Sequence, residues 1–447
     1  MGLLLTVAGC GLAYGTLEAF RRYDWGYGPV RTGLLALLIV AALVLIRVAP
    51  GRTGNWMPQP HWVAAVIFAG TACLAAATVY QGVVEFAKTR RGRAIEFDQG
   101  KVGFRATRML VKGMNPYGRD VVLDTVEYAA GVAAIARAGC LASGPRIDVG
   151  LSVAESFAKD YNPHRFDNLV PKIADRPGCG VARLRAESFG MKYGPTLLVA
   201  YLPFVQLWGQ AGIFAAQLLF LAVAGVFLAR FGWRTGRGSL LFTCLPLAAW
   251  LLPSHMRHNV LALPASDVFP TALAIAAWGL IEEKRDTSGA VCLALACAAK
   301  LVPGFLYLPL LLRCRRRAHV AFAVTLGLLF GPFLGWDARG LLLNFFLYGF
   351  LRDADSTGLM YYLPGLAAAG VRILCAAAAL AALLYAHRRR YDFPGLLTFF
   401  LVVHGAALTS GRIFHNNYLV WLLPLFGLTL VAALARREQA AVPLATG

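Results

Sequence analysis

About twelve apolar windows run through the chain, and they constrain its fold more than any other feature. An α-helix needs about 20 apolar residues to cross the hydrocarbon core of a bilayer, and most of the windows approach that length. Of the 447 residues, 58% are hydrophobic and 15% charged, whereas about a quarter of the residues in soluble domains are charged. The chain is therefore predicted to be an all-α polytopic membrane protein with about 12 transmembrane helices. The windows lie near residues 3–20, 33–49, 62–84, 194–209, 211–230, 239–253, 262–281, 288–312, 319–336, 366–386, 393–410 and 416–435.

Clusters of basic residues between the windows indicate orientation, because cytoplasmic loops carry an excess of Lys and Arg. With twelve spans, the best clusters fall on one side, which is then cytoplasmic: Arg313 with Arg315–Arg317, His387 with Arg388–Arg390, and Arg436–Arg437. This count predicts a multi-pass protein of the inner (plasma) membrane, with residues 87–192 and 337–365 outside. It also puts Arg230, Arg234 and Arg237 outside, against the rule. Splitting window 288–312 into two half-helices at Lys300–Pro303 would correct this and reverse everything upstream.

The net charge of +20 comes from basic residues that flank apolar windows. In that position they orient helices and meet anionic lipid headgroups, so membrane lipids are expected partners and nucleic acid is not. The nine cysteines form no CxxC pair and no Cys/His spacing typical of a metal site, so no metal centre is predicted.

The stretch Glu96–Tyr117 follows an apolar window and predicts a short amphipathic helix. Asp98 stands at the position of an N-cap and Gly113 at that of a C-terminal stop. Four cations fall on one face at i, i+4, i+7 and i+11, namely Lys101, Arg105, Arg108 and Lys112, which leaves Val102, Met109 and Leu110 for the lipid side. Such a helix either binds phosphate beside a chemical step or is an interfacial anchor with an ordinary cap.

Ionisable residues within apolar windows are costly, so each is a functional candidate. Asp267 stands at the start of one window, where it is either a ligand contact or an N-cap ahead of Pro270. Lys300 interrupts another window, where its side chain either snorkels to the interface or holds an anionic headgroup. Arg412, His415 and Asn417 precede the last window as ligand contacts or as a hydrogen-bonded helix start.

Two acidic pairs could hold a divalent cation, although only on extended backbone, where side chains at i and i+2 face the same way. They are Asp353 with Asp355 and Glu96 with Asp98. A solvated acidic loop is the other interpretation of Asp353 and Asp355.

Several short motifs occur together along the chain. They are Asp98 with Asn115-Pro116-Tyr117, Lys192-Tyr193-Gly194-Pro195 followed by Leu202-Pro203, Asp267 with Pro270, Gly289–Lys300 with Pro303, and Asn417–Pro424. In these motifs the sequence resembles the GT-C superfamily of membrane glycosyltransferases, most closely the polyprenyl-phosphate-sugar-dependent enzymes of glycosyltransferase family 87. The resemblance covers about residues 60–435. The departures are two extra N-terminal helices, an unusually long first outer loop, and Gly194 in place of a proline.

The resemblance implies a GT-C-like membrane domain at 61–435, preceded by two additional helices in 1–60 and followed by a cytoplasmic tail, 436–447. It also implies transfer of a sugar, such as mannose or another hexose or pentose, with inversion at the outer face, from a polyprenyl-phosphate donor to a hydroxyl of a glycolipid or polysaccharide acceptor. No cofactor is required, and a divalent cation is possible. The extracytoplasmic loop 87–192 would be the first catalytic loop.

A hydroxyl acceptor needs a base, and a lipid-phosphate leaving group needs cations rather than an acid. The resemblance places the base at Asp98, with Glu96 beside it. The donor phosphate would meet Arg105, Arg108, Lys112, Lys300 and Arg412, and substrate would contact Tyr117, Tyr193, Asp267, His415 and Asn417. The main alternative is a transporter or flippase for a lipid-linked sugar or solute, whose basic residues bind a headgroup while no bond is made. A transporter more often carries its site at midplane on broken helices, and a structural membrane protein is a third class.

Overall fold

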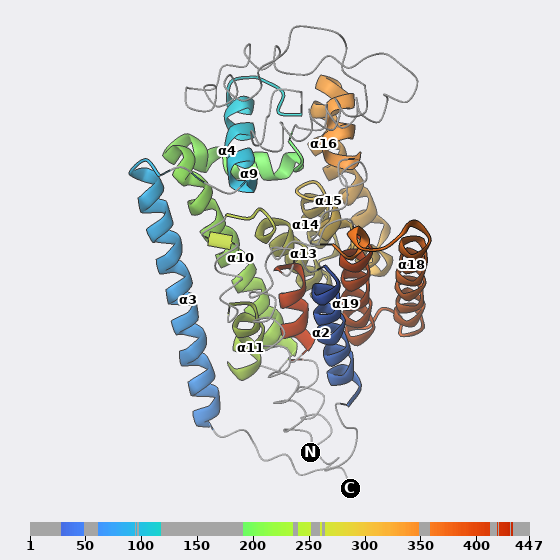
Figure 1. Cartoon of the computed structure of the whole chain (residues 1–447). Helices are drawn as coiled ribbons and strands as arrows, with labels where there is room; N and C mark the ends of the chain where they lie inside the picture. Colours follow the sequence, from blue (N-terminus) through green and yellow to red (C-terminus); the bar gives the residue numbers. More distant parts are fainter. Residues whose placement is uncertain are drawn as a thin grey trace.

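Every secondary-structure element in the described part of the chain is helical (Figure 1). The computed structural model describes residues 28–48, 61–93, 95, 98–117, 191–235, 240–251, 260–261, 264–347, 358–411, 418, 420–429 and 431. Among these residues, five helices are long and apolar enough to cross a membrane. The prediction of an all-α membrane protein is confirmed to this extent, while the total of twelve spans stays a prediction.

The helices follow the apolar windows, because a backbone in lipid must satisfy its own hydrogen bonds. The longer ones are α2 (Gly28–Val48), α3 (His61–Arg90), α4 (Asp98–Val111), α9 (Pro195–Trp208), α10 (Gly212–Thr235), α11 (Leu240–Leu251), α13 (Val268–Glu282), α14 (Asp286–Cys297), α16 (Arg316–Leu341), α18 (Gly365–Arg388) and α19 (Phe393–Ser410). The short ones are η1 (Gly209–Ala211), α15 (Leu301–Phe305), η3 (Leu308–Arg313), η4 (Leu342–Leu347) and η5 (Leu359–Tyr361).

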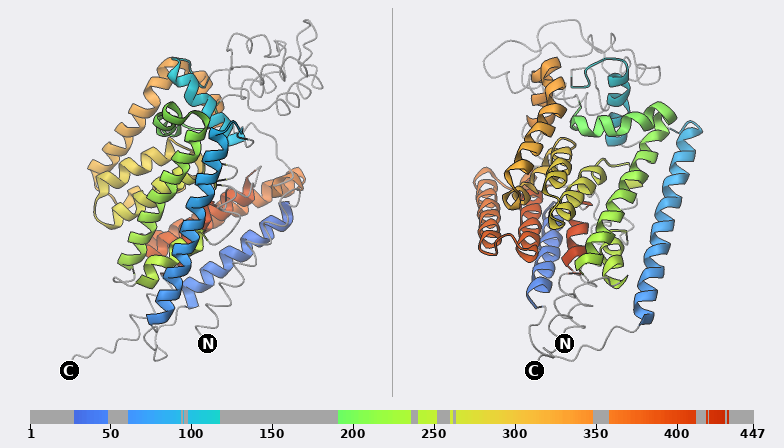
Figure 2. Two further views of the ribbon diagram at one scale, coloured as in Figure 1. Left: turned by 90° about the vertical axis from the view of Figure 1, so that its left-hand side faces the viewer. Right: turned by 180° about the vertical axis from the view of Figure 1, so that it is seen from behind.

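The core of the bundle lies between α10, α13, α14 and α19. The Trp278 ring lies 5.2 Å from the ring of Phe231 on α10 and 5.0 Å from that of Phe400 on α19. The helix α3 runs along one side of the bundle, at the left in Figure 1 and at the right in the right-hand view of Figure 2. Outward-facing Leu366, which is 92% exposed, and Ile373 give α18 the apolar surface expected of a helix that faces lipid.

The window 288–312 is broken at Lys300. The helix α14 ends at Cys297, the backbone of Lys300 is extended (φ −152°, ψ 129°), and α15 and η3 follow as two short pieces. Pro303 lies in the first turn of α15, where its missing N–H costs no helical bond.

The two ends of the broken segment lie at the same end of the bundle. Arg313, at the end of η3, forms an ion pair with Glu282 at the end of α13. The backbone N–H of Arg315 donates to Asp286 Oδ2, at the start of α14, over 3.3 Å. The segment 286–313 is therefore a hairpin of two half-helices with Lys300 at its apex. Window 288–312 is therefore split into two half-helices at Lys300 and does not form a single span.

The hairpin brings the basic clusters together. Arg230 Nε lies 2.5 Å and Arg234 Nη1 3.2 Å from Glu283 Oε1, next to the Arg313–Glu282 pair. Phe393, which follows Arg388–Arg390 closely, packs on Phe231 at the same end, with 5.2 Å between ring centroids. We call this end of the molecule the basic end.

The helix α9 runs roughly crosswise to α3 and α10 and packs on α4 and α10 (Figure 1). It starts just after Tyr193, and the ring of Trp208 at its other end packs on Phe86, near the end of α3, at 5.9 Å. Both ends of α9 therefore lie beside the described ends of the long loop 87–192. This differs from the expectation of a separate crossing at 194–209. Compared with the twelve-span expectation, α9 and the hairpin each remove one crossing of the bundle. Because two crossings are removed, the sides stay as expected, and the described ends of the loop lie opposite the basic end.

Candidate functional site

The predicted helix after α3 is present as α4, and it ends as the sequence indicates. Gly113 has φ 72°, a value that glycine adopts without strain. The Gly113 N–H donates to Leu110 O over 3.0 Å and the Met114 N–H to Met109 O over 2.9 Å. This pair of bonds is a Schellman motif, which satisfies the last carbonyls of a helix.

The apolar face of α4 packs on protein, which corrects the expectation that it faces lipid. Val102 and Met109 are each 1% exposed, and Gly103 lies against the ring of Tyr201 on α9. On the other side, Arg108 and Lys112 are exposed, with the Arg108 guanidinium 5.7 Å from the Phe104 ring centroid. Arg105 is half-buried and Leu110 likewise, while the side chain of Lys101 lies outside what the structure describes.

The first turn of α4 is joined to the segment that precedes α13. Gln99 Oε1 accepts hydrogen bonds from the Ser266 N–H at 2.8 Å and from Ser266 Oγ at 3.0 Å, and all these groups are buried. Because Asp98 precedes Gln99 and Asp267 follows Ser266, the two acidic positions stand on neighbouring turns. The Asp98 side chain and all of Glu96 lie outside the described residues.

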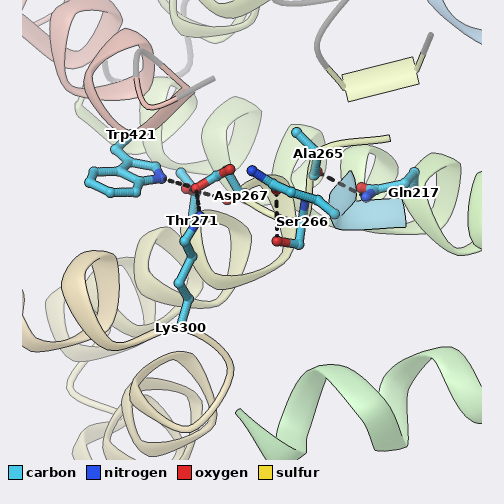
Figure 3. Close-up of polar contacts among 8 residues, drawn as sticks. Gln217, Ala265, Ser266, Asp267, Thr271, Lys300 and Trp421 are labelled. Atoms are coloured by element: carbon cyan, nitrogen blue, oxygen red, sulfur yellow. Dashed lines mark hydrogen bonds and ion pairs between the residues drawn. The ribbon is translucent and has the colours of Figure 1, made fainter. Parts of the chain in front are cut away.

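Asp267 is the buried centre of the site. It is 0% exposed, and its Oδ1 accepts from Lys300 Nζ at 2.5 Å and from Trp421 Nε1 at 2.7 Å. Figure 3 shows Lys300 and Trp421 both pointing toward this carboxylate. Asp267 stands at the N-cap position of α13, but its side chain makes no capping hydrogen bond there and instead accepts from Lys300 and Trp421.

Aromatic rings surround the Lys300 ammonium. Its Nζ lies 5.5 Å from the ring centroid of Tyr193, 5.1 Å from that of Tyr418 and 5.5 Å from that of Trp421. The Lys300 side chain keeps 15% of its surface exposed. Lys300 therefore does not snorkel away from the bundle. It stays at the hairpin apex, where low dielectric strengthens its attraction for an anion.

The two backbone segments that end at Tyr117 and begin at Met191, both within the long loop, meet beside this apex. The Met191 N–H donates to Pro116 O over 3.2 Å, and Tyr117 Oη donates to Tyr193 O over 2.8 Å. Burial raises the pKa of Tyr117 well above its ordinary value. Its hydroxyl therefore stays protonated and joins the two ends of the loop, which makes Tyr117 a positioning residue.

Backbone hydrogen bonds at Gly194 and Thr196 join the start of α9 to the hairpin apex. Its N–H donates to Ala299 O over 2.8 Å, and the Thr196 N–H donates to Ala298 O over 3.1 Å. A Cβ atom on Gly194 would overlap Ala298 O. A proline here would lose the N–H donor as well, so this contact explains why glycine stands where the family resembled has proline.

The structure thus assembles one site from four of the expected residues and four others. Tyr117, Tyr193, Asp267 and Lys300 come together, and they are joined by Gln99, Ser266, Tyr418 and Trp421. Tyr418 and Trp421 could have been found from the sequence because they lie in the motif Asn417–Pro424, whereas no sequence feature marks Gln99 or Ser266 as a site residue. Arg412, His415, Asn417, Asp353 and Asp355 lie outside the described residues.

Chemically, the site offers a partly exposed ammonium, a buried carboxylate and aromatic walls beside the first turn of a basic helix. An anionic group is the ligand that such an ammonium favours. Within the described ranges, no three His, Cys, Asp or Glu side chains are placed to hold a metal ion. No protein-family model matches the chain, and searches of curated proteins and of solved structures found no match either.

Proposed function

We propose that the chain is an integral-membrane glycosyltransferase that moves a sugar from a polyprenyl-phosphate donor to a hydroxyl of a lipid- or glycan-type acceptor. The observation that supports this proposal best is the Gln99–Ser266 contact, with hydrogen bonds of 2.8 and 3.0 Å. It joins the turn that carries Asp98 to the segment whose Asp267 holds Lys300. A carboxylate base beside a cation is what transfer from a lipid phosphate requires.

In the proposed reaction, Asp98 accepts the proton of the acceptor hydroxyl. The hydroxyl oxygen attacks the anomeric carbon from the face opposite the leaving group, and the bond from that carbon to the phosphate oxygen breaks. The released polyprenyl phosphate keeps the electron pair, so it needs cations and no general acid. Lys300 supplies one cation, and Arg105, Arg108 and Lys112 on α4 supply others. Attack from the opposite face gives inversion at the anomeric carbon.

We place this reaction at the outer face of the plasma membrane. The basic end of the molecule gathers Arg230, Arg234 and Arg313, and an excess of Arg marks the cytoplasmic side. The described ends of loop 87–192 lie at the opposite end, next to the site. A lipid-linked donor fits this location, because it is held by the membrane itself.

A second candidate is a transporter of a lipid-linked sugar or solute, favoured by the hairpin of α14 and α15. Broken helices with a charged residue at the break carry the substrate sites of many secondary transporters. In that case the headgroup would bind at Lys300 and no bond would form. Counterflow of a labelled lipid-linked sugar in proteoliposomes without acceptor would then be observed, and it is not expected of the transferase.

The direct test incubates the purified protein with radiolabelled polyprenyl-phosphate sugars and a membrane extract, and looks for a new labelled product. Asp98→Asn should fold, because Asn caps a helix about as well as Asp, and should lower the rate by about a hundredfold to ten-thousandfold. The matched control is Asp392→Asn, the same change at a residue that caps α19 through Gly395 N at 2.9 Å. Near-normal turnover by folded Asp98→Asn would exclude Asp98 as the base.

A further inference from the structure

A cavity lies at the basic end, remote from the site above. It measures about 260 Å³ and is lined by the end of α10, the end of α13 and the start of α19. Its apolar wall contains Phe227, Phe231 and Phe393, and the last two rings pack at 5.2 Å. The α10 residues that line the cavity, Phe227 to Thr235, follow the start of α10 at Gly212 by 15 to 23 positions, which is about 23–35 Å at about 1.5 Å per residue.

Charged side chains form the rim of the cavity, and cations exceed anions there. Arg230 and Arg234 both contact Glu283, whose side chain is only 6% exposed, while theirs are 48% and 50% exposed. The neighbouring Glu282 carboxylate is paired with Arg313. Three guanidinium groups therefore stand beside two carboxylates. Arg234 contacts Glu283 through Nη1, at 3.2 Å, and a guanidinium carries five N–H donors in all.

An aromatic wall under a cationic rim, at the ends of membrane helices, complements an amphiphile with an anionic head. We propose that this cavity binds an anionic phospholipid of the surrounding leaflet. Its phosphate lies against Arg230 and Arg234, and the upper part of one acyl chain lies along Phe227 and Phe393. Basic pockets between membrane helices hold anionic headgroups in this way. Free phosphate would leave the aromatic wall uncovered, so the lipid is the better match.

Gly279 provides a way to fill the cavity without changing its charge. It lies in the lining, and a Cβ built on it is 3.7 Å from Phe231 Cδ2 and 3.9 Å from Phe227 Cδ1. Alanine would fit, so the further atoms of Gly279→Leu extend into the space that the acyl chain would occupy. The matched control is Gly370→Leu on α18, where nothing lies within 4 Å of a built Cβ.

The test uses native mass spectrometry of the full chain in detergent, with added dioleoyl phosphatidylglycerol or dioleoyl phosphatidylcholine, which share their acyl chains. We expect the wild type and Gly370→Leu to retain phosphatidylglycerol at least about tenfold better than phosphatidylcholine. Arg234→Gln should weaken phosphatidylglycerol retention about tenfold, and Gly279→Leu should abolish it.

Three results of the retention measurement would each overturn the proposal. They are equal retention of the two lipids by the wild type, undiminished retention by Gly279→Leu, and displacement of the lipid by an equal concentration of inorganic phosphate. A wild-type measurement keeps the test independent of how the variants fold. A photoactivatable phosphatidylglycerol should crosslink to α10, α13 or α19 near the cavity, and crosslinks only elsewhere would place the lipid at another site.

Discussion

The buried pair of Asp267 and Lys300 allows a sharp test, because its two members should respond unequally to substitution. Lys300→Met removes the ammonium that lies 2.5 Å from Asp267 Oδ1. The carboxylate, which is 0% exposed, keeps the Trp421 N–H as a donor at 2.7 Å but loses its counter-charge. Removing one partner of a buried ion pair costs about 3–5 kcal/mol. We therefore expect the free energy of unfolding to fall by that amount.

Asp267→Asn should cost less. The amide oxygen of Asn still accepts from Trp421, and the Lys300 ammonium keeps its three ring contacts and a side chain that is 15% exposed. We expect a loss of about 1–3 kcal/mol, the cost of one charge-assisted hydrogen bond. The double variant Lys300→Met/Asp267→Asn buries no charge, so it should be more stable than Lys300→Met alone by about 2 kcal/mol or more.

The stability measurement is denaturant unfolding of the detergent-solubilised protein, followed by tryptophan fluorescence. A second measurement, of the apparent KM for the polyprenyl-phosphate sugar, separates stability from function. The double variant should regain stability but not donor binding, because the cation is still missing. If the double variant loses as much stability as the two single variants combined, the residues do not act as a pair and the description of the site is wrong.

Three further predictions concern topology, the basic face of α4 and the start of α9. In a cysteine-free background, Lys284→Cys and Arg317→Cys should react with a membrane-impermeant thiol reagent from the same side of the membrane. Asn162→Cys should react from the other side. Labelling of Lys284→Cys and Arg317→Cys from opposite sides would contradict the hairpin. Arg108→Ala should raise the apparent KM for donor by about tenfold or more through loss of one charge-assisted contact, and an unchanged value would make α4 an anchor. Gly194→Ala should lower stability by about 1–3 kcal/mol because its Cβ overlaps Ala298 O, whereas Gly370→Ala should not.

Local features of the fold could be predicted from the sequence because their causes are local. The helix α4 begins at Asp98, where the sequence predicts a helix start, and its end at Gly113 follows from C-terminal capping within a few residues. The buried face of α4 could not be assigned in the same way. An apolar stripe has the same spacing whether it meets lipid or protein, so the sequence predicts a lipid-facing Val102 and Met109, whereas both are buried within the protein.

Long-range features needed the structure. Lys300 and Asp267 are 33 positions apart, and only the hairpin brings them into contact. The window 288–312 is long enough to cross a bilayer, so length favoured one span while Lys300 and Pro303 marked the break. Gln99 and Ser266 gave no signal at all, because a neutral hydrogen-bonding pair has no spacing rule when its members lie 167 positions apart.

The contact between Pro116 and Met191 has a consequence for how this chain can vary. Pro116 and Met191 are adjacent in space although 75 positions apart, with Met191 N 3.2 Å from Pro116 O. The length of the segment in between is therefore independent of the geometry of α4, α9 and the hairpin apex. Each doubling of a loop's length costs only about 0.6 kcal/mol of closure free energy. A change in the number of residues between Tyr117 and Met191 is therefore expected to leave the contacts of Tyr117, Tyr193 and Lys300 in place.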